Sequence, residues 1–160
     1  MIGILKSGES VADRSDGSHI HESVKPYIVE ALASIDAEQK DFLVEEVNFG
    51  KEIGKSVCVV TEMHDQIIFA QRPNRFGHTR FVIGKEPEPC SSVVVILKLT
   101  EEQGYVLLTA FIGRKAEPEP WDRNATEKSA EFWSTRALVW GSEPIIPGTE
   151  TFECPWNLRK

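Results

Sequence analysis

Alternation of apolar and polar residues dominates the middle of the chain and predicts β-strands over residues 56–62, 66–72 and 75–84. The longest such pattern, SVVVILKLT, EEQG and YVLLTAFIG, predicts a hairpin over residues 92–113 with a four-residue connection. Pairing of Thr100 with Tyr105 across this connection predicts one wholly apolar face. That face consists of Val95, Leu97, Leu99, Val106, Leu108, Ala110 and Ile112.

Two helices are predicted before the strands. Pro26 suits the first turn of a helix that runs to about Ser34. Asp36 followed by Gln39 is typical of a capping box and predicts a second helix that ends near Gly50. The apolar side of the first helix is expected to contain Ile28, Val29 and Leu32.

A third helix is predicted over residues 125–139, capped by Asn124 and Glu127. Its apolar and polar residues recur at helical spacing, which predicts that four of them line one stripe. These four are Ser129, Trp133, Arg136 and Trp140.

The order of these elements predicts an α+β fold, in which the N-terminal helices pack on an antiparallel meander of four to five strands. The late helix follows the central hairpin. A length of 160 residues fits one domain. We therefore expect a mobile polar arm over 1–23 and a single domain over 24–160, divided into helical 24–50, sheet 55–113, helix 124–140 and a loop-rich tail 141–160.

Charge is distributed unevenly along the chain. The net charge of −7 argues against a protein that coats nucleic acid by charge alone. Residues 66–115 form the basic segment, with seven Lys and Arg against four Asp and Glu. A local cationic patch on an acidic body is suited to hold an anionic substrate.

Composition also limits cofactors and location. Cys58, Cys90 and Cys154 are widely spaced, which indicates neither a disulfide framework nor a zinc site. We expect no metal and no other cofactor. The chain has no apolar run of spanning length and no signal-peptide pattern, so we expect a cytoplasmic protein without a membrane partner.

The candidate chemistry begins in RFGHTRFVIG, residues 75–84. Strand alternation places His78 and Arg80 on one face and Thr79 and Phe81 on the other. The face with His78 is either an exposed polar surface or the beginning of a site.

Cleavage of RNA by 2′-hydroxyl attack requires a base near neutrality, an acid for the leaving oxygen, and cations or hydrogen-bond donors around the phosphate. Imidazole, as in His78, suits proton transfer, and the planar guanidinium groups of Arg80 and Arg136 suit phosphate. Hydroxyl groups are expected to position the phosphate, and aromatic rings to stack a base. The further candidates are Thr109 in catalysis, and Ser129, Lys98, Tyr105 and Trp133 in substrate binding, with Trp121 as another stacking residue.

As a set, GHTRFVIG, YVLLTAFIGRKAEPEPWD and SAEFWSTRALVW resemble phage- and mobile-element nucleases of the barnase, EndoU, colicin and RelE-like superfamily. The resemblance covers residues 66–140. It implies N-terminal helices on a four-stranded antiparallel sheet and a metal-independent, toxin-type endoribonuclease. RNA is the implied substrate, and an immunity or antitoxin protein is a further partner.

Within that resemblance, His78 and Arg80 match the first motif strand, Thr109 matches the threonine of TAF, and Ser129 and Trp133 match the helix motif. Arg136 stands where relatives are expected to carry a histidine. The ribonuclease is the leading hypothesis, and this difference leaves open, as the alternatives, an altered mechanism or an inactive module that binds RNA or a protein. A third interpretation assigns function to the Pro- and Trp-rich loops 116–123 and 141–156, as a contact between copies.

Overall fold

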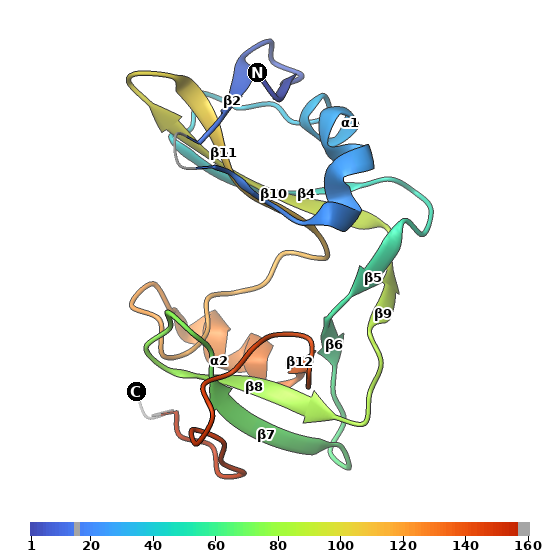
Figure 1. Cartoon of the computed structure of the whole chain (residues 1–160), viewed down its shortest axis with the longest axis vertical. Helices are drawn as coiled ribbons and strands as arrows, with labels where there is room; N and C mark the ends of the chain where they lie inside the picture. The colour runs from blue at the N-terminus through green and yellow to red at the C-terminus, as the bar shows by residue number, and fades with distance from the viewer. Residues whose placement is uncertain (15–16, 157–160) are drawn as a thin grey trace. The chain divides into compact units, whose positions relative to one another are not determined.

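The computed structural model describes residues 1–14 and 17–156 and divides into two compact units. Unit 1 comprises Met1–Ser56 and Pro89–Lys115, and unit 2 comprises Val57–Glu88 and Ala116–Lys160. Helices and strands occur in both units (Figure 1), so the α+β class is confirmed in its coarse form. The range 24–160, expected as a single domain, contributes to both units, because the chain passes from one unit to the other after Ser56, Glu88 and Lys115.

The sheet of unit 1 has six strands, with the order β1-β2-β11-β10-β4 and β3 paired with β11. β10 is antiparallel to both of its neighbours, whereas β11 is parallel to β2 and β3. The sheet is therefore not a sequential meander. Its strands are β1 (Gly3–Ile4), β2 (Ser10–Asp13), β3 (His19–Ile20), β4 (Phe42–Asn48), β10 (Ser92–Thr100) and β11 (Gly104–Ile112).

One short helical segment covers a face of this sheet (Figure 1). It consists of the 3-10 helix η1 (Glu22–Tyr27), which contains Pro26, and α1 (Ile28–Leu32). Part of the first predicted helix is present as α1, but Pro26 lies in the preceding 3-10 helix, and Val29 is 59% exposed rather than on the apolar side. The core between helix and sheet contains Val24, Ile28, Ala31, Leu32, Val93, Val95 and Leu97.

The second predicted helix is wrong, because residues 42–48 form β4. Asp36 accepts a hydrogen bond from the Glu38 backbone N–H, as in a turn, and does not cap a helix. Glu38 and Gln39 have φ values of 52° and 60°, a left-handed conformation that a right-handed helix cannot contain. The sequence FLVEEVN then pairs along β10, so cross-strand partners decide its conformation.

The expectation of a mobile arm over 1–23 is wrong for the described part of that range. β1, β2 and β3 lie within the arm and join the sheet, and Val11 is 0% exposed beside its partner Tyr105. Residues 15 and 16 lie outside the described residues.

The central hairpin is confirmed, but its register differs from the predicted one. Thr100 pairs with Gly104, not Tyr105, so the turn consists of the three residues 101–103. Gly104, which follows the turn, has φ of 72°. Leu108 is an extra residue at a bulge, so pairing changes phase along β11. The buried face therefore gains Tyr105 and Leu107, whereas Leu99 at its end is 38% exposed.

The sheet of unit 2 has four strands in the order β6-β12-β8-β7, with β12 and β8 parallel. The strands are β6 (Cys58–Val60), β7 (Gln66–Gln71), β8 (His78–Ile83) and β12 (Arg136–Val139). A separate two-stranded sheet pairs β5 (Gly54–Ser56) with β9 (Glu88–Cys90). In the described residues no helix is long and apolar enough to cross a membrane.

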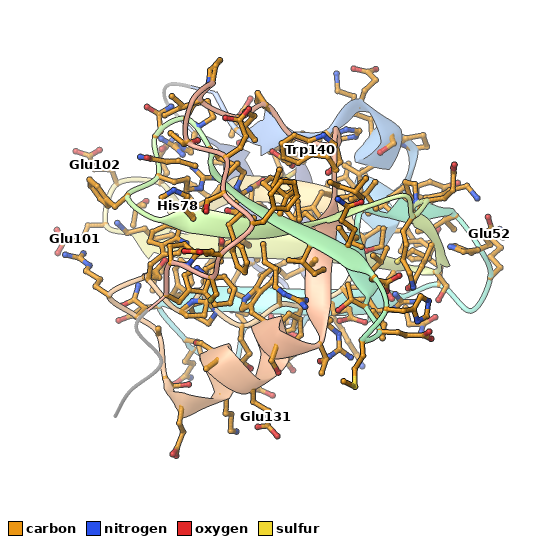
Figure 2. All side chains as sticks on the ribbon, turned by 90° about the horizontal axis from the view of Figure 1, so that it is seen from below. Glu52, His78, Glu101, Glu102, Glu131 and Trp140 are labelled. Atoms are coloured by element: carbon orange, nitrogen blue, oxygen red, sulfur yellow. The ribbon has the colours of Figure 1, made fainter. Side chains whose placement is uncertain are left out.

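The late helix α2 (Glu127–Ser134) is shorter than predicted and is capped by Thr126 rather than Asn124. Arg136 lies on β12, which pairs with β6 and β8, so the predicted stripe of four residues is wrong at Arg136 and Trp140. Ser129 and Trp133 stay together on the buried face of α2. Glu131 of the same helix points away from the body (Figure 2).

A pair of leucines on β10 tests the observed core of unit 1. Leu97→Ala removes a side chain that is 0% exposed, and we expect it to lower the unfolding free energy by about 2–5 kcal/mol. Leu99→Ala, at a position that is 38% exposed, is the matched control with a much smaller cost. Urea unfolding followed by far-UV circular dichroism measures both, and equal costs would contradict the observed register.

Candidate functional site

A hollow of about 400 Å³ lies within unit 2, at the start of β8. Aromatic rings and prolines dominate its lining, and two Pro–Trp dipeptides from different loops contribute to it. Its volume lies in the range of small-molecule sites in proteins. The residues that line the hollow are Phe76, Gly77, His78, Pro120, Trp121, Pro155 and Trp156.

Trp121 packs directly against the backbone before β8. A Cβ atom added at Gly77 would lie 2.1 Å from Cγ of Trp121, so only glycine permits this approach. The indole Nε1 of Trp121 donates a hydrogen bond to Oε1 of Glu119 over 3.1 Å. The ring is thereby fixed by a close backbone contact and by an interaction at its edge.

Glu119 is held in turn by Arg72 at the end of the preceding hairpin strand. Nη2 of Arg72 donates to Oε2 of Glu119 over 2.6 Å, with side chains 15% and 9% exposed. Nε of Arg72 donates to Oγ1 of the fully buried Thr79 over 3.0 Å. A continuous polar chain thus runs from Thr79 in β8 through Arg72 and Glu119 to Trp121.

Trp156 is positioned by a separate set of contacts. Its Nε1 donates to the backbone carbonyl of His78 over 2.9 Å. Its ring meets Phe69 of β7 edge to face, with centroids 5.1 Å apart. Both indole N–H groups at the hollow therefore donate to acceptors within the protein.

His78 begins β8 and lines the hollow as a partly buried residue; Figure 2 labels it. The loop before it contains Phe76, which is 97% exposed, and the exposed Arg75. Residues 72–80, RPNRFGHTR, carry three arginines and no carboxylate. Of these three arginines only Arg75 is exposed, whereas Arg72 and Arg80 are partly buried.

Arg80 and Arg136 are brought together, but through the backbone. Nη1 of Arg80 donates to Oγ1 of Thr61 and to the carbonyl of Arg136, each over 2.9 Å. Burial lowers the pKa of the half-buried Arg80 guanidinium, because desolvation disfavours its charge. The guanidinium of Arg136 lies 4.7 Å from the ring centroid of Phe132. Arg80 therefore joins β8 to β12.

Ser129 and Trp133 serve the packing of α2. Ser129 is 0% exposed, and its Oγ accepts a hydrogen bond from the backbone N–H of Thr126 in a capping box. Trp133 is 4% exposed and donates from Nε1 to the Glu117 carbonyl over 2.8 Å. Neither side chain is available for the substrate-binding role predicted from the sequence.

The remaining predicted residues belong to unit 1. Tyr105 is 4% exposed, and its hydroxyl donates to the Lys40 carbonyl over 2.6 Å. Burial raises its pKa, because the phenolate would be desolvated. Lys98 is exposed on β10 and Thr109 is partly buried on β11. Neither unit contains the whole predicted catalytic set, and His78 alone of that set lines the hollow.

Sequence reasoning found part of the hollow. It identified His78, proposed Trp121 for stacking, and pointed to the loops 116–123 and 141–156. It gave no individual role to Phe76, Gly77 or Trp156, although Trp156 lies in the second of these loops. The available signal was the repeated Pro–Trp dipeptide, at 120–121 and again at 155–156.

Neither a search for metal ligands nor a comparison with known proteins assigns a role to further residues. Across residues 1–14 and 17–156, no group of three or more His, Cys, Asp or Glu is placed to hold a metal ion. No protein-family model, curated protein or solved structure matches the chain. The nuclease resemblance therefore stays a proposal.

Gly77→Ala tests the packing of Trp121. We expect the added methyl group to displace the ring and to lower the unfolding free energy by about 1–3 kcal/mol. Urea unfolding measures this cost, and near-UV circular dichroism reports the displaced indole. In a Trp121→Gly background the cost should largely disappear, because the clashing atoms are absent. The same cost in both backgrounds would show that Gly77 acts independently of Trp121.

Proposed function

We propose that the chain binds single-stranded RNA and that the hollow at the start of β8 accepts one unpaired base. The observation that carries this proposal is the ring arrangement around the hollow: Phe76, Trp121, Trp156 and the imidazole of His78. Unpaired bases bind proteins by stacking on such rings, with little dependence on sequence.

The hydrogen bonds of the two indoles support stacking over other contacts. Trp121 and Trp156 each use their single N–H donor inside the protein. A proline-rich peptide bound by hydrogen bonds from tryptophan N–H groups would find neither donor free. A flat ligand that needs only ring faces is better matched.

Charge at the rim supports an anionic chain. Arg75 is exposed beside Phe76, and the segment 72–80 lacks carboxylates. Phosphate groups that flank a stacked base would meet this cationic edge. The acidic remainder of the chain limits binding to this patch, since the net charge is −7.

A metal-independent, toxin-type ribonuclease is a second candidate, favoured by the position of His78 at the hollow. Of the described residues that line the hollow, His78 is the one with a titratable side chain. Acid–base cleavage uses two proton transfers, so binding without turnover is the better supported function. A cytoplasmic setting and an immunity or antitoxin partner belong to this second candidate.

Two phenylalanines test the proposal on the full chain. Phe76 is 97% exposed and lines the hollow, whereas Phe42 is 55% exposed on β4 in unit 1. Phe76→Ala should weaken binding of a fluorescein-labelled, unstructured RNA oligonucleotide about tenfold, the effect of losing one stacking contact. Phe42→Ala should leave it unchanged. Fluorescence anisotropy at fixed low salt measures both affinities.

Gel analysis of the same mixtures separates the alternatives. RNA that stays intact supports a binding module, whereas cleavage in a chelator that is lost in His78→Ala supports the ribonuclease. Absence of RNA binding by the unaltered chain would exclude both. Equal weakening by Phe76→Ala and Phe42→Ala would exclude the hollow as the binding site.

A further inference from the structure

We propose that the buried ion pair of Arg72 and Glu119 determines which class of ligand enters the hollow. It neutralises the carboxylate that holds Trp121, so this carboxylate adds no attraction for organic cations and does not repel an uncharged or anionic planar group. This inference rests on the proposed function and specifies the chemistry of its ligand.

Rings alone would not make this choice. The faces of Trp and Phe attract cations, and a cluster of such rings is the usual receptor for quaternary ammonium groups. The hollow has this composition, with Phe76, Trp121 and Trp156 around it. A carboxylate at the edge of one ring would strengthen the attraction for a cation, since opposite charges attract over several ångströms.

Such a carboxylate is present and is already compensated. Glu119 is 8% exposed, and its Oε1 accepts the N–H of Trp121 while its Oε2 accepts from Arg72. Nη1 of Arg72 also lies 3.8 Å from Oε1 of Glu143. The side chain of Glu143 is 39% exposed, so water screens this second carboxylate more effectively than Glu119.

The geometry also separates the two roles of Glu119. Its hydrogen bond to Trp121 fixes the ring, and glutamine retains an oxygen that can accept the same bond. Its charge is balanced by Arg72. Substitutions at the two positions can therefore change the charge behind Trp121 in opposite directions, while the rings that line the hollow keep their identity.

Three variants of the full chain test the role of the ion pair: Glu119→Gln, Arg72→Met, and both together. Isothermal titration calorimetry with adenosine 5′-monophosphate and with tetramethylammonium measures the affinity of each variant for the two ligands. Glu119→Gln leaves the solvent-screened carboxylate of Glu143 as the remaining anion beside Arg72 among the described ion pairs, and we expect about fivefold tighter binding of the nucleotide. Arg72→Met leaves the negative charge of Glu119 beside Trp121 without its cation. We expect about fivefold weaker binding of the nucleotide and measurable binding of tetramethylammonium. The double variant removes both charges of the pair, so its preference between the two ligands should return toward that of the unaltered chain.

The outcomes separate this inference from the proposed function. If the unaltered chain binds neither the nucleotide nor RNA, the proposed function is overturned. Normal nucleotide binding with the same preference in Glu119→Gln and in the double variant overturns only the role of the ion pair. Stronger binding of tetramethylammonium than of nucleotide by the unaltered chain also overturns it. Where Arg72→Met does not fold, the comparison of Glu119→Gln with the double variant decides the question.

Discussion

The site in unit 2 depends on the buried pair of Arg72 and Glu119. An ion pair removed from water gains little net stability, because desolvation offsets most of the attraction. Here the pair is surrounded by further hydrogen bonds, to Thr79 on one side and Trp121 on the other. Its effect is geometric: it fixes a tryptophan from a distant loop against the glycine that precedes β8. Without Glu119, the indole would lose the acceptor for its only donor.

The arginines of this chain show that residue type does not establish a role. The sequence favoured Arg80 and Arg136 as phosphate clamps, since guanidinium groups suit phosphate. In the structure Arg80 is half-buried and bonded to two neutral oxygens, which join β8 to Thr61 and to β12. The partly buried Arg72 is paired with the Glu119 that holds Trp121, and the exposed Arg75 precedes Phe76 of the hollow in the sequence. Only their partners distinguish these four side chains.

Secondary structure could be predicted where alternation and turn residues agree. The strands over 66–72 and 75–84 and the hairpin over 92–113 follow from β-branched, alternating sequence, and each is present. The segments 36–50 and 125–139 are amphipathic in a way that suits helix or strand, so local pattern could not separate them. β4 is a strand because β10 pairs with it, and Arg136 leaves α2 because β12 lies between β6 and β8. The hairpin register also depended on the bulge at Leu108.

By itself, the sequence determined the local features of the site: a strand with His78 on its less buried side, a cationic run before it, and two Pro–Trp dipeptides in loops. The tertiary structure decided that both tryptophans meet at that strand, and that Thr109, Lys98 and Tyr105 belong to another unit. The physical reason is the sequence separation over which the interactions act. Alternation and capping act between residues a few positions apart, whereas the hollow forms from contacts between segments far apart in the chain, which depend on the path of the whole backbone.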